Sequence, residues 1–150
     1  MRAIIQRVSE ASVSINKKLQ AEIQQGFVVL LGISPSDTQE DIEWLCKKIC
    51  NLRIFSDENG KMNLSLINIK GDIILISQFT LFASTKKGNR PSFLNSASPD
   101  IAIPLYEEFI TSLERELQKP IYTGVFGADM KVQLVNDGPV TIHLDSKNKE

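Results

Sequence analysis

The chain has 150 residues, 42% of them hydrophobic, and its 17 lysines and arginines nearly balance its 18 aspartates and glutamates. This length is enough to bury one hydrophobic core, and no linker rich in proline, glycine or serine divides it, so we expect one domain over residues 1–150. The net charge of −1 argues against general coating of nucleic acid, so a polyanionic partner would have to meet a local basic patch. Because the first residues lack the apolar region of a signal peptide and no apolar run approaches about 18 residues, we predict a cytoplasmic protein without membrane spans.

The first third of the sequence predicts strands followed by a helix. Aliphatic and β-branched residues are concentrated in residues 2–8, 11–15 and 27–33, which we interpret as three strands. Asp37 and Glu40 resemble a capping box, and apolar residues at positions 42, 45, 46 and 49 predict a helix that ends at about Leu52. This helix should cover one face of the sheet.

Both cysteines of the chain, Cys46 and Cys50, fall on the apolar face of this predicted helix. We therefore expect them to be buried and reduced. A metal site is not expected, because the chain has one histidine and no second pair of cysteines to complete a set of ligands.

The rest of the sequence predicts a second helix between strands. Residues 57–60 carry a turn signal, and residues 72–79 predict a strand that is buried on both faces and becomes polar at its end. Ser98 as N-cap and Pro99 at the first helical position begin the helix. The apolar stripe of this helix comprises Tyr106, Phe109, Ile110, Leu113 and Leu117. The last predicted strands are residues 121–126, 130–135 and 140–144. A frayed polar tail is expected at 145–150. This order predicts an α+β domain with antiparallel or mixed, barrel-like β-sheets flanked by two main helices.

The polar end of the buried strand is the first candidate site. Ser77, Gln78 and Thr80 place two hydroxyl groups and an amide where side chains are held rigidly and can face a cleft. A nucleophilic serine or threonine would need a base nearby, and the one histidine, His143, lies on the polar face of the last predicted strand. No sequence signature of a catalytic triad is present.

A basic segment and a Gly-Pro step are two further candidates. Lys86, Lys87 and Arg90 lie in a glycine-containing loop that could bind phosphates or be an ordinary solvated loop, and no known phosphate-, zinc- or RNA-binding motif decides between these. Gly138 and Pro139 interrupt a run of strand residues. Proline withholds one hydrogen bond from the sheet and glycine permits unusual backbone geometry, so the step is either a turn or a means of directing carbonyl groups at a ligand.

Two motifs, Ser77-Gln78-Phe79-Thr80-Leu81 and Asn136-Asp137-Gly138-Pro139-Val140-Thr141, together resemble the signature motifs of the D-aminoacyl-tRNA deacylase family. The resemblance extends nearly from end to end and includes, in the order of the family, Ile5-Gln6-Arg7-Val8, Asn51-Leu52-Arg53-Ile54-Phe55, Gly60-Lys61-Met62-Asn63, Gly88-Asn89-Arg90-Pro91-Ser92-Phe93 and Gly124-Val125-Phe126-Gly127-Ala128-Asp129-Met130. It implies a hydrolase that cleaves the ester bond of D-aminoacyl-tRNA, and of glycyl-tRNA mischarged on tRNA-Ala, and releases free amino acid and tRNA as a chiral proofreading step. We expect no cofactor, no metal and no specificity for DNA.

The resemblance also implies a homodimer with its active sites at the subunit interface. Gly138 and Pro139, joined by a cis peptide bond, would act in the partner's site, where their carbonyl oxygens exclude an L side chain. A rigid backbone wall can reject a substrate by clash more strongly than a soft pocket can select one. Arg7 matches the family residue that braces this segment, although by itself it could be a strand-edge arginine in a surface ion pair.

The roles of the other site residues follow from the same resemblance. Phe126, Gly127 and Met130 match a segment that would hold the terminal adenosine of tRNA, with Lys86, Lys87 and Arg90 as tRNA-binding residues. Our mechanistic hypothesis is that Ser77 and the backbone N–H of Phe79 polarise the ester carbonyl and Gln78 positions the ester, while the ribose 2′-hydroxyl assists an attacking water. The rival is Thr80 as a covalent nucleophile.

Two functions of other classes remain open at this point. One is a non-catalytic RNA-binding module that uses the basic loop, with the Gly-Pro step only structural. The other is an obligate dimer without a ligand, against which the polar end of the buried strand argues.

Overall fold

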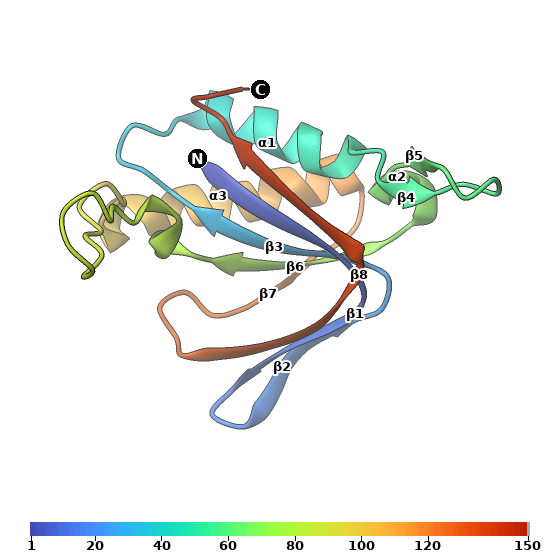
Figure 1. Cartoon of the computed structure of the whole chain (residues 1–150), viewed down its shortest axis with the longest axis horizontal. Helices are drawn as coiled ribbons and strands as arrows, with labels where there is room; N and C mark the ends of the chain where they lie inside the picture. Colours follow the sequence, from blue (N-terminus) through green and yellow to red (C-terminus); the bar gives the residue numbers. More distant parts are fainter. Residues whose placement is uncertain (150) are drawn as a thin grey trace.

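The architecture is organised around β1 (Arg2–Ile15), a long strand with three antiparallel partners. The computed structural model describes residues 1–149. The first half of β1 pairs with β3 (Gly26–Gly32), its second half with β2 (Lys18–Ile23), and β8 (Met130–Asp145) runs along its whole length. Beyond β3 the sheet continues in parallel with β6 (Asp72–Ser77) and β7 (Tyr122–Thr123), so that the mixed sheet curls into a nearly closed barrel (Figure 1).

Two long helices cover one side of this sheet. α1 (Gln39–Asn51) and α3 (Pro99–Leu117) lie side by side, as Figure 1 shows. The smaller elements are the hairpin β4 (Phe55–Ser56) and β5 (Met62–Leu64), the short helix α2 (Leu66–Ile69) and the 3-10 turn η1 (Phe79–Phe82). The predicted single α+β domain, with a barrel-like mixed sheet and two main helices, is confirmed.

The core has two parts, one on each face of the sheet. The larger part lies between sheet and helices, and the smaller lies inside the curl of the sheet. β6 contributes to both, because Ile73 and Leu75 point into the first part while Ile74 and Ile76 point into the second. Burial of this strand on both faces was predicted and is confirmed. The α3 stripe is buried as predicted, except that Ile110 is only half-buried. Cys46 and Cys50 are buried and unpaired, as expected.

Several predicted strand boundaries are wrong. The predicted strands 2–8 and 11–15 form the single strand β1, because pairing with β8 continues past the exposed residues 9 and 10 through irregularities in register. The predicted strands 130–135 and 140–144 are likewise the single strand β8. β2 was missed because its residues 18–20 are exposed and mostly polar. The predicted strands 72–79 and 121–126 are shorter, as β6 and β7.

The predicted capping box of α1 is also wrong by one residue. The N-cap is Thr38, whose backbone N–H donates to Asp41 Oδ2 at 2.8 Å. Asp37 is engaged elsewhere, because its carboxylate accepts hydrogen bonds from the Met1 amino group at 2.5 Å and from the Ser34 backbone at 2.7 Å. A carboxylate held this way cannot also cap the helix.

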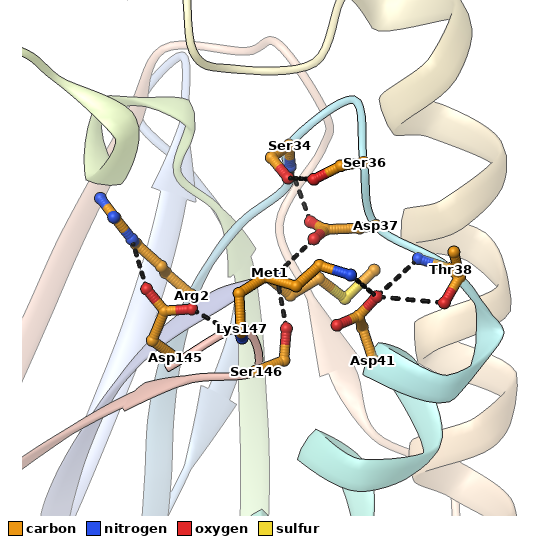
Figure 2. Close-up of polar contacts among 10 residues, drawn as sticks. All are labelled: Met1, Arg2, Ser34, Ser36, Asp37, Thr38, Asp41, Asp145, Ser146 and Lys147. Carbon is orange, nitrogen blue, oxygen red and sulfur yellow. Dashed lines mark hydrogen bonds and ion pairs between the residues drawn. The ribbon is translucent and has the colours of Figure 1, made fainter. Parts of the chain in front are cut away.

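The tail predicted to fray at 145–150 is instead ordered at its start. Asp145 ends β8, and Ser146 is buried and accepts a hydrogen bond from the Met1 amino group at 2.7 Å. Lys147 Nζ donates to Asp41 Oδ2 at 2.7 Å (Figure 2). These contacts fix the end of β8 to the start of α1. The last residue of the predicted tail, 150, lies outside the described residues.

The helices of the structure can be compared with the prediction that the protein has no membrane spans. Within residues 1–149, no helix combines the length and the apolar composition that crossing a bilayer requires.

Candidate active site

A cavity of about 720 Å³ opens where β6 ends. Its walls come from the end of β6 and the turn after it, from the segment that leads into α3, and from the turn that precedes β8. The lining residues are Leu31, Ile33, Ile76, Ser77, Gln78, Phe79, Phe93, Leu94, Ser96, Ala97, Ser98, Pro99, Ala102, Phe126, Gly127, Ala128, Asp129, Met130 and Val132. Most of these side chains are apolar; the polar ones are Ser77 and Gln78 at the strand end, Ser96 and Ser98 before α3, and Asp129 before β8.

The strand end is held by the neighbouring strand. The backbone N–H of Gln78 donates to the Leu31 oxygen at 2.7 Å, which extends the parallel pairing of β3 and β6 by one residue. The chain then turns into η1, so the N–H of Phe79 is the first of the turn and has no acceptor within it. The side-chain amide of Gln78 donates to Thr80 Oγ1. Thr80 itself is exposed and does not line the cavity.

A second wall is the turn at residues 124–130. Gly124 N donates to the Leu75 oxygen at 3.1 Å, which ties this turn to β6. The ring of Phe126 meets the edge of the buried Tyr106 ring, with centroids 5.8 Å apart. A Cβ at Gly124 would lie 2.3 Å from the Met130 sulfur, so glycine is required for Met130 to occupy its place. The cavity therefore brings Ser77, Gln78 and Phe79 together with Phe126, Gly127 and Met130.

The Gly138–Pro139 step lies elsewhere, within β8. Its peptide bond is cis, the state that the family resemblance implies. Arg7, which is 7% exposed, donates from Nε to the Asp137 oxygen at 2.9 Å and from Nη1 to the Ile54 oxygen, so it joins this segment to the chain just before β4. Gly138 and Pro139 are exposed, and neither they nor Arg7 line the cavity of their own chain. Gly138 is eight residues along β8 from Met130, up to roughly 25 Å at about 3.3 Å per residue.

The basic loop also lies outside the cavity lining. Lys86, Lys87 and Arg90 are exposed, and none of them forms an ion pair with another residue in the described part of the chain. The loop is closed at its base by two backbone hydrogen bonds between Ser84 and Ser92, at 2.8 and 2.9 Å. This closure places the end of the basic loop directly before two residues that line the cavity mouth, Phe93 and Leu94.

Comparison with known proteins decides the family. A family model described as D-Tyr-tRNA(Tyr) deacylase matches residues 4–145. The chain belongs to the D-Tyr-tRNA(Tyr) deacylase family. Proteins named D-aminoacyl-tRNA deacylase from Flavobacterium johnsoniae and Bacteroides fragilis are 63% and 61% identical to this chain over 150 residues, with complete coverage of both sequences. The predicted family and the prediction of a hydrolase are thus confirmed.

Solved structures agree with this deacylase family fold. A protein named c-Myc DNA Unwinding Element Binding Protein superposes with a TM-score of 0.92 at 41% identity, over 97% of this chain and 98% of that chain. A structure described as a probable eukaryotic D-amino acid tRNA deacylase gives a TM-score of 0.80 over 95% of this chain and 97% of that chain. Its identity is 17%, so it establishes the fold alone.

For a deacylase site, the cavity is poor in groups that could act as base or nucleophile. Asp129 is the one ionisable side chain among the described residues that line it, and it is exposed and paired with Lys131 at 2.9 Å. His143 is not among the lining residues, so the structure assembles no serine–histidine pair there. Burial raises the pKa of Cys46 well above its usual range and that of Cys50 to about 12, which keeps both thiols protonated. Within residues 1–149 we find no cluster of His, Cys, Asp and Glu that could hold a metal ion.

Sequence reasoning missed the third wall of this cavity. No role at the site was predicted for residues 93–98, yet Phe93, Leu94 and Ser96–Ser98 line the cavity together with the first turn of α3. The available signal was an adjacent pair of large apolar residues, Phe93 and Leu94, within an otherwise polar loop.

Proposed function

We propose that this protein hydrolyses the ester bond of D-aminoacyl-tRNA and releases free D-amino acid and tRNA. The observation that carries the proposal is the cavity, which the strand-end residues Ser77, Gln78 and Phe79 line together with Phe126 and Met130. One wall offers hydrogen-bond donors for an ester, and the other offers an aromatic face and a thioether for a nucleobase. A cavity of about 720 Å³ is large enough for an aminoacylated terminal adenosine.

Positioning and polarisation account for the chemistry without a side-chain base. The Ser77 hydroxyl and the free N–H of Phe79 donate to the ester carbonyl oxygen, where negative charge develops as water attacks. Gln78 positions the ester, and the 2′-hydroxyl of the terminal ribose orients the attacking water. The bond between the carbonyl carbon and the ribose oxygen breaks, and that oxygen leaves with a proton from the water. The lack of a histidine or a low-pKa cysteine at the cavity favours this route over a covalent one.

Selectivity for the D configuration comes from a second copy of the chain. In a homodimer, Gly138 and Pro139 of one subunit enter the cavity of the other, and their carbonyl oxygens stand where an L side chain would point. Two observations support this arrangement: the exposed Gly138–Pro139 step is remote from its own cavity along β8, and Arg7 holds it in a fixed place. The exposed apolar residues Val132 and Leu134, two positions apart and so on one face of β8, also suit contact with a partner.

A wall that acts only by excluding an L side chain also admits glycine, which has none. We therefore include glycyl-tRNA mischarged on tRNA-Ala among the substrates and assign the protein a proofreading role in translation. Such substrates place the enzyme in the cytoplasm, where aminoacyl-tRNA is used.

The test is release of amino acid from matched D- and L-aminoacylated tRNA, without added metal, by wild-type protein and by Pro139→Ala. We expect rapid release from the D substrate alone by wild type, and loss of that selectivity in the variant. A folded wild-type protein that binds uncharged tRNA in a salt-sensitive manner but cleaves neither ester would contradict the proposal and leave the non-catalytic RNA-binding module in its place.

A further inference from the structure

The cavity mouth carries an exposed apolar shelf formed by Phe79, Phe93 and Leu94. Phe79 is 56% exposed, Phe93 37% and Leu94 91%, and all three line the cavity. The rings of Phe79 and Phe93 meet edge to face with centroids 5.0 Å apart, so each fixes the orientation of the other. Single exposed apolar residues are ordinary, but three of them gathered at the rim of one cavity mark a binding surface.

The shelf is structurally continuous with the basic loop. The two backbone hydrogen bonds between Ser84 and Ser92 close the loop immediately before Phe93. Arg90 lies three residues before Phe93 in the sequence, and it and the two lysines carry positive charges that no described residue neutralises. Flat apolar faces and unpaired cations are thus presented together on one short segment.

This combination suits single-stranded nucleic acid better than a protein partner. Bases stack on exposed aromatic and apolar side chains, while phosphates are drawn to nearby lysines and arginines. A partner protein that covered the shelf would need acidic groups opposite three cations in addition to an apolar patch. A strand of RNA supplies both kinds of contact with every nucleotide.

The shelf lies outside the part of the cavity that the proposed function gives to the terminal adenosine. Phe126, Gly127 and Met130 belong to the wall at residues 124–130, whereas Phe93 and Leu94 belong to the segment between the basic loop and α3. We propose that Phe93 and Leu94 stack the nucleotide that precedes the terminal adenosine in the single-stranded 3′ end of tRNA, and that the basic loop holds the phosphates on the 5′ side of that nucleotide. This inference rests on the proposed function and adds a second nucleotide-binding subsite to it.

The test compares two substrates that differ only in the nucleotides before the adenosine. One is full-length D-aminoacyl-tRNA and the other is the same D-amino acid esterified to adenosine alone. For Phe93→Ala and Leu94→Ser we expect kcat/KM on the tRNA to fall about 10-fold more than kcat/KM on the adenosine ester, with the difference arising in KM. Leu94 is almost fully exposed, so Leu94→Ser tests the subsite even if Phe93→Ala disturbs folding.

Leu19→Ser is the matched control. Leu19 is 62% exposed on β2 and does not line the cavity, so Leu19→Ser should leave kcat/KM unchanged on both substrates. Equal losses on both substrates for the shelf variants, or no loss on either, would overturn the subsite while leaving the deacylase function intact. Dissociation of Leu94→Ser into monomers at a concentration where wild type is dimeric would overturn it too, because the shelf would then belong to the contact between copies. A wild-type protein that cleaves neither ester would overturn the proposed function itself.

Discussion

Tyr106 of α3 donates a hydrogen bond from its buried hydroxyl group to the backbone oxygen of Leu75 in β6, at 3.0 Å. The same oxygen accepts the N–H of Gly124, and the Tyr106 ring contacts Phe126. One carbonyl group of the central sheet thus anchors both the long helix and the turn that forms a wall of the cavity.

Replacing Tyr106 by Phe should keep the ring contact and remove this hydrogen bond. We expect a loss of about 0.5–1.5 kcal/mol in the free energy of unfolding, measured by chemical denaturation. Burial raises the pKa of Tyr106 to about 12. The folded state thereby favours the protonated Tyr106 hydroxyl. The contribution of this hydroxyl to the free energy of unfolding is complete below pH 10 and is lost as the pH rises from about 10 towards 12. The difference in free energy of unfolding between wild type and Tyr106→Phe should therefore decrease between about pH 10 and 12. A difference that stays constant over this pH range would contradict the prediction.

Gly124→Ala should disturb, through Met130, the cavity wall that we propose for the terminal adenosine. The new Cβ would lie 2.3 Å from the Met130 sulfur, so the thioether must move out of its place in the cavity lining. We expect KM for D-aminoacyl-tRNA to rise about 10-fold with a smaller change in kcat. In the double variant with Met130→Ala the effect of Gly124→Ala should vanish, because the atom it displaces is gone. Additive effects of the two substitutions would refute a route through Met130.

Arg7→Lys should weaken chiral selection more than it weakens the fold. A lysine cannot donate to the Asp137 and Ile54 oxygens together in the planar geometry of a guanidinium, so the Gly138–Pro139 segment loses its brace. We expect the ratio of D to L cleavage to fall at least 10-fold. Arg115→Lys is the control, because Arg115 is exposed on α3 and its side chain donates to Ser112 of the same helix, so the substitution leaves the brace of the Gly-Pro step in place. A comparable fall in the ratio of D to L cleavage in both variants would show that the loss of selectivity does not come from the brace at the Gly138–Pro139 segment.

Thr80→Ala separates the two mechanistic routes. Thr80 accepts a hydrogen bond from the Gln78 amide and does not line the cavity, so its removal should leave Gln78 less well oriented without removing a reacting atom. We expect kcat to fall less than about 10-fold, with unchanged thermal unfolding. Loss of nearly all turnover in a folded variant would establish the covalent route through Thr80 instead.

Asp41→Asn should alter the acid sensitivity of the fold. Burial alone would raise the pKa of Asp41, but hydrogen bonds from Lys147, Ser146 and Thr38 outweigh it and hold that pKa well below its usual value. A depressed pKa contributes stability above pH about 4 that is lost as the pH falls further. The variant should therefore be about 1–2 kcal/mol less stable than wild type at pH 7, with a smaller difference at pH 3, in denaturant titrations. Glu58→Gln, in the exposed turn at 57–60, should show neither effect.

The sequence predicted those features that depend on local chemistry. The polar residues Ser77 and Gln78 after four buried aliphatic residues identified the polar end of the strand, although the predicted strand extended two residues too far, and Ser98 and Pro99 identified the start of α3. The cap of α1 was misplaced because Asp37 binds the Met1 amino group, a contact between residues 36 positions apart that no local pattern reports. Phe93 was missed for the same reason, since it reaches the cavity mouth through a contact with Phe79 of η1, 14 residues earlier in the chain.

The single strand β8 carries both Met130, in the wall of one cavity, and the Gly-Pro step eight residues further on. β8 is paired with β1 on either side of that step, with an irregularity in register at the step itself, so a shift of the whole of β8 along β1 would move both features at once. Under the proposed function, substrate fit and stereochemical discrimination would therefore be mechanically coupled through β8. A substitution that moves the backbone of β8 should then change both substrate fit and stereochemical discrimination. Changes in one property alone would have to come from side chains.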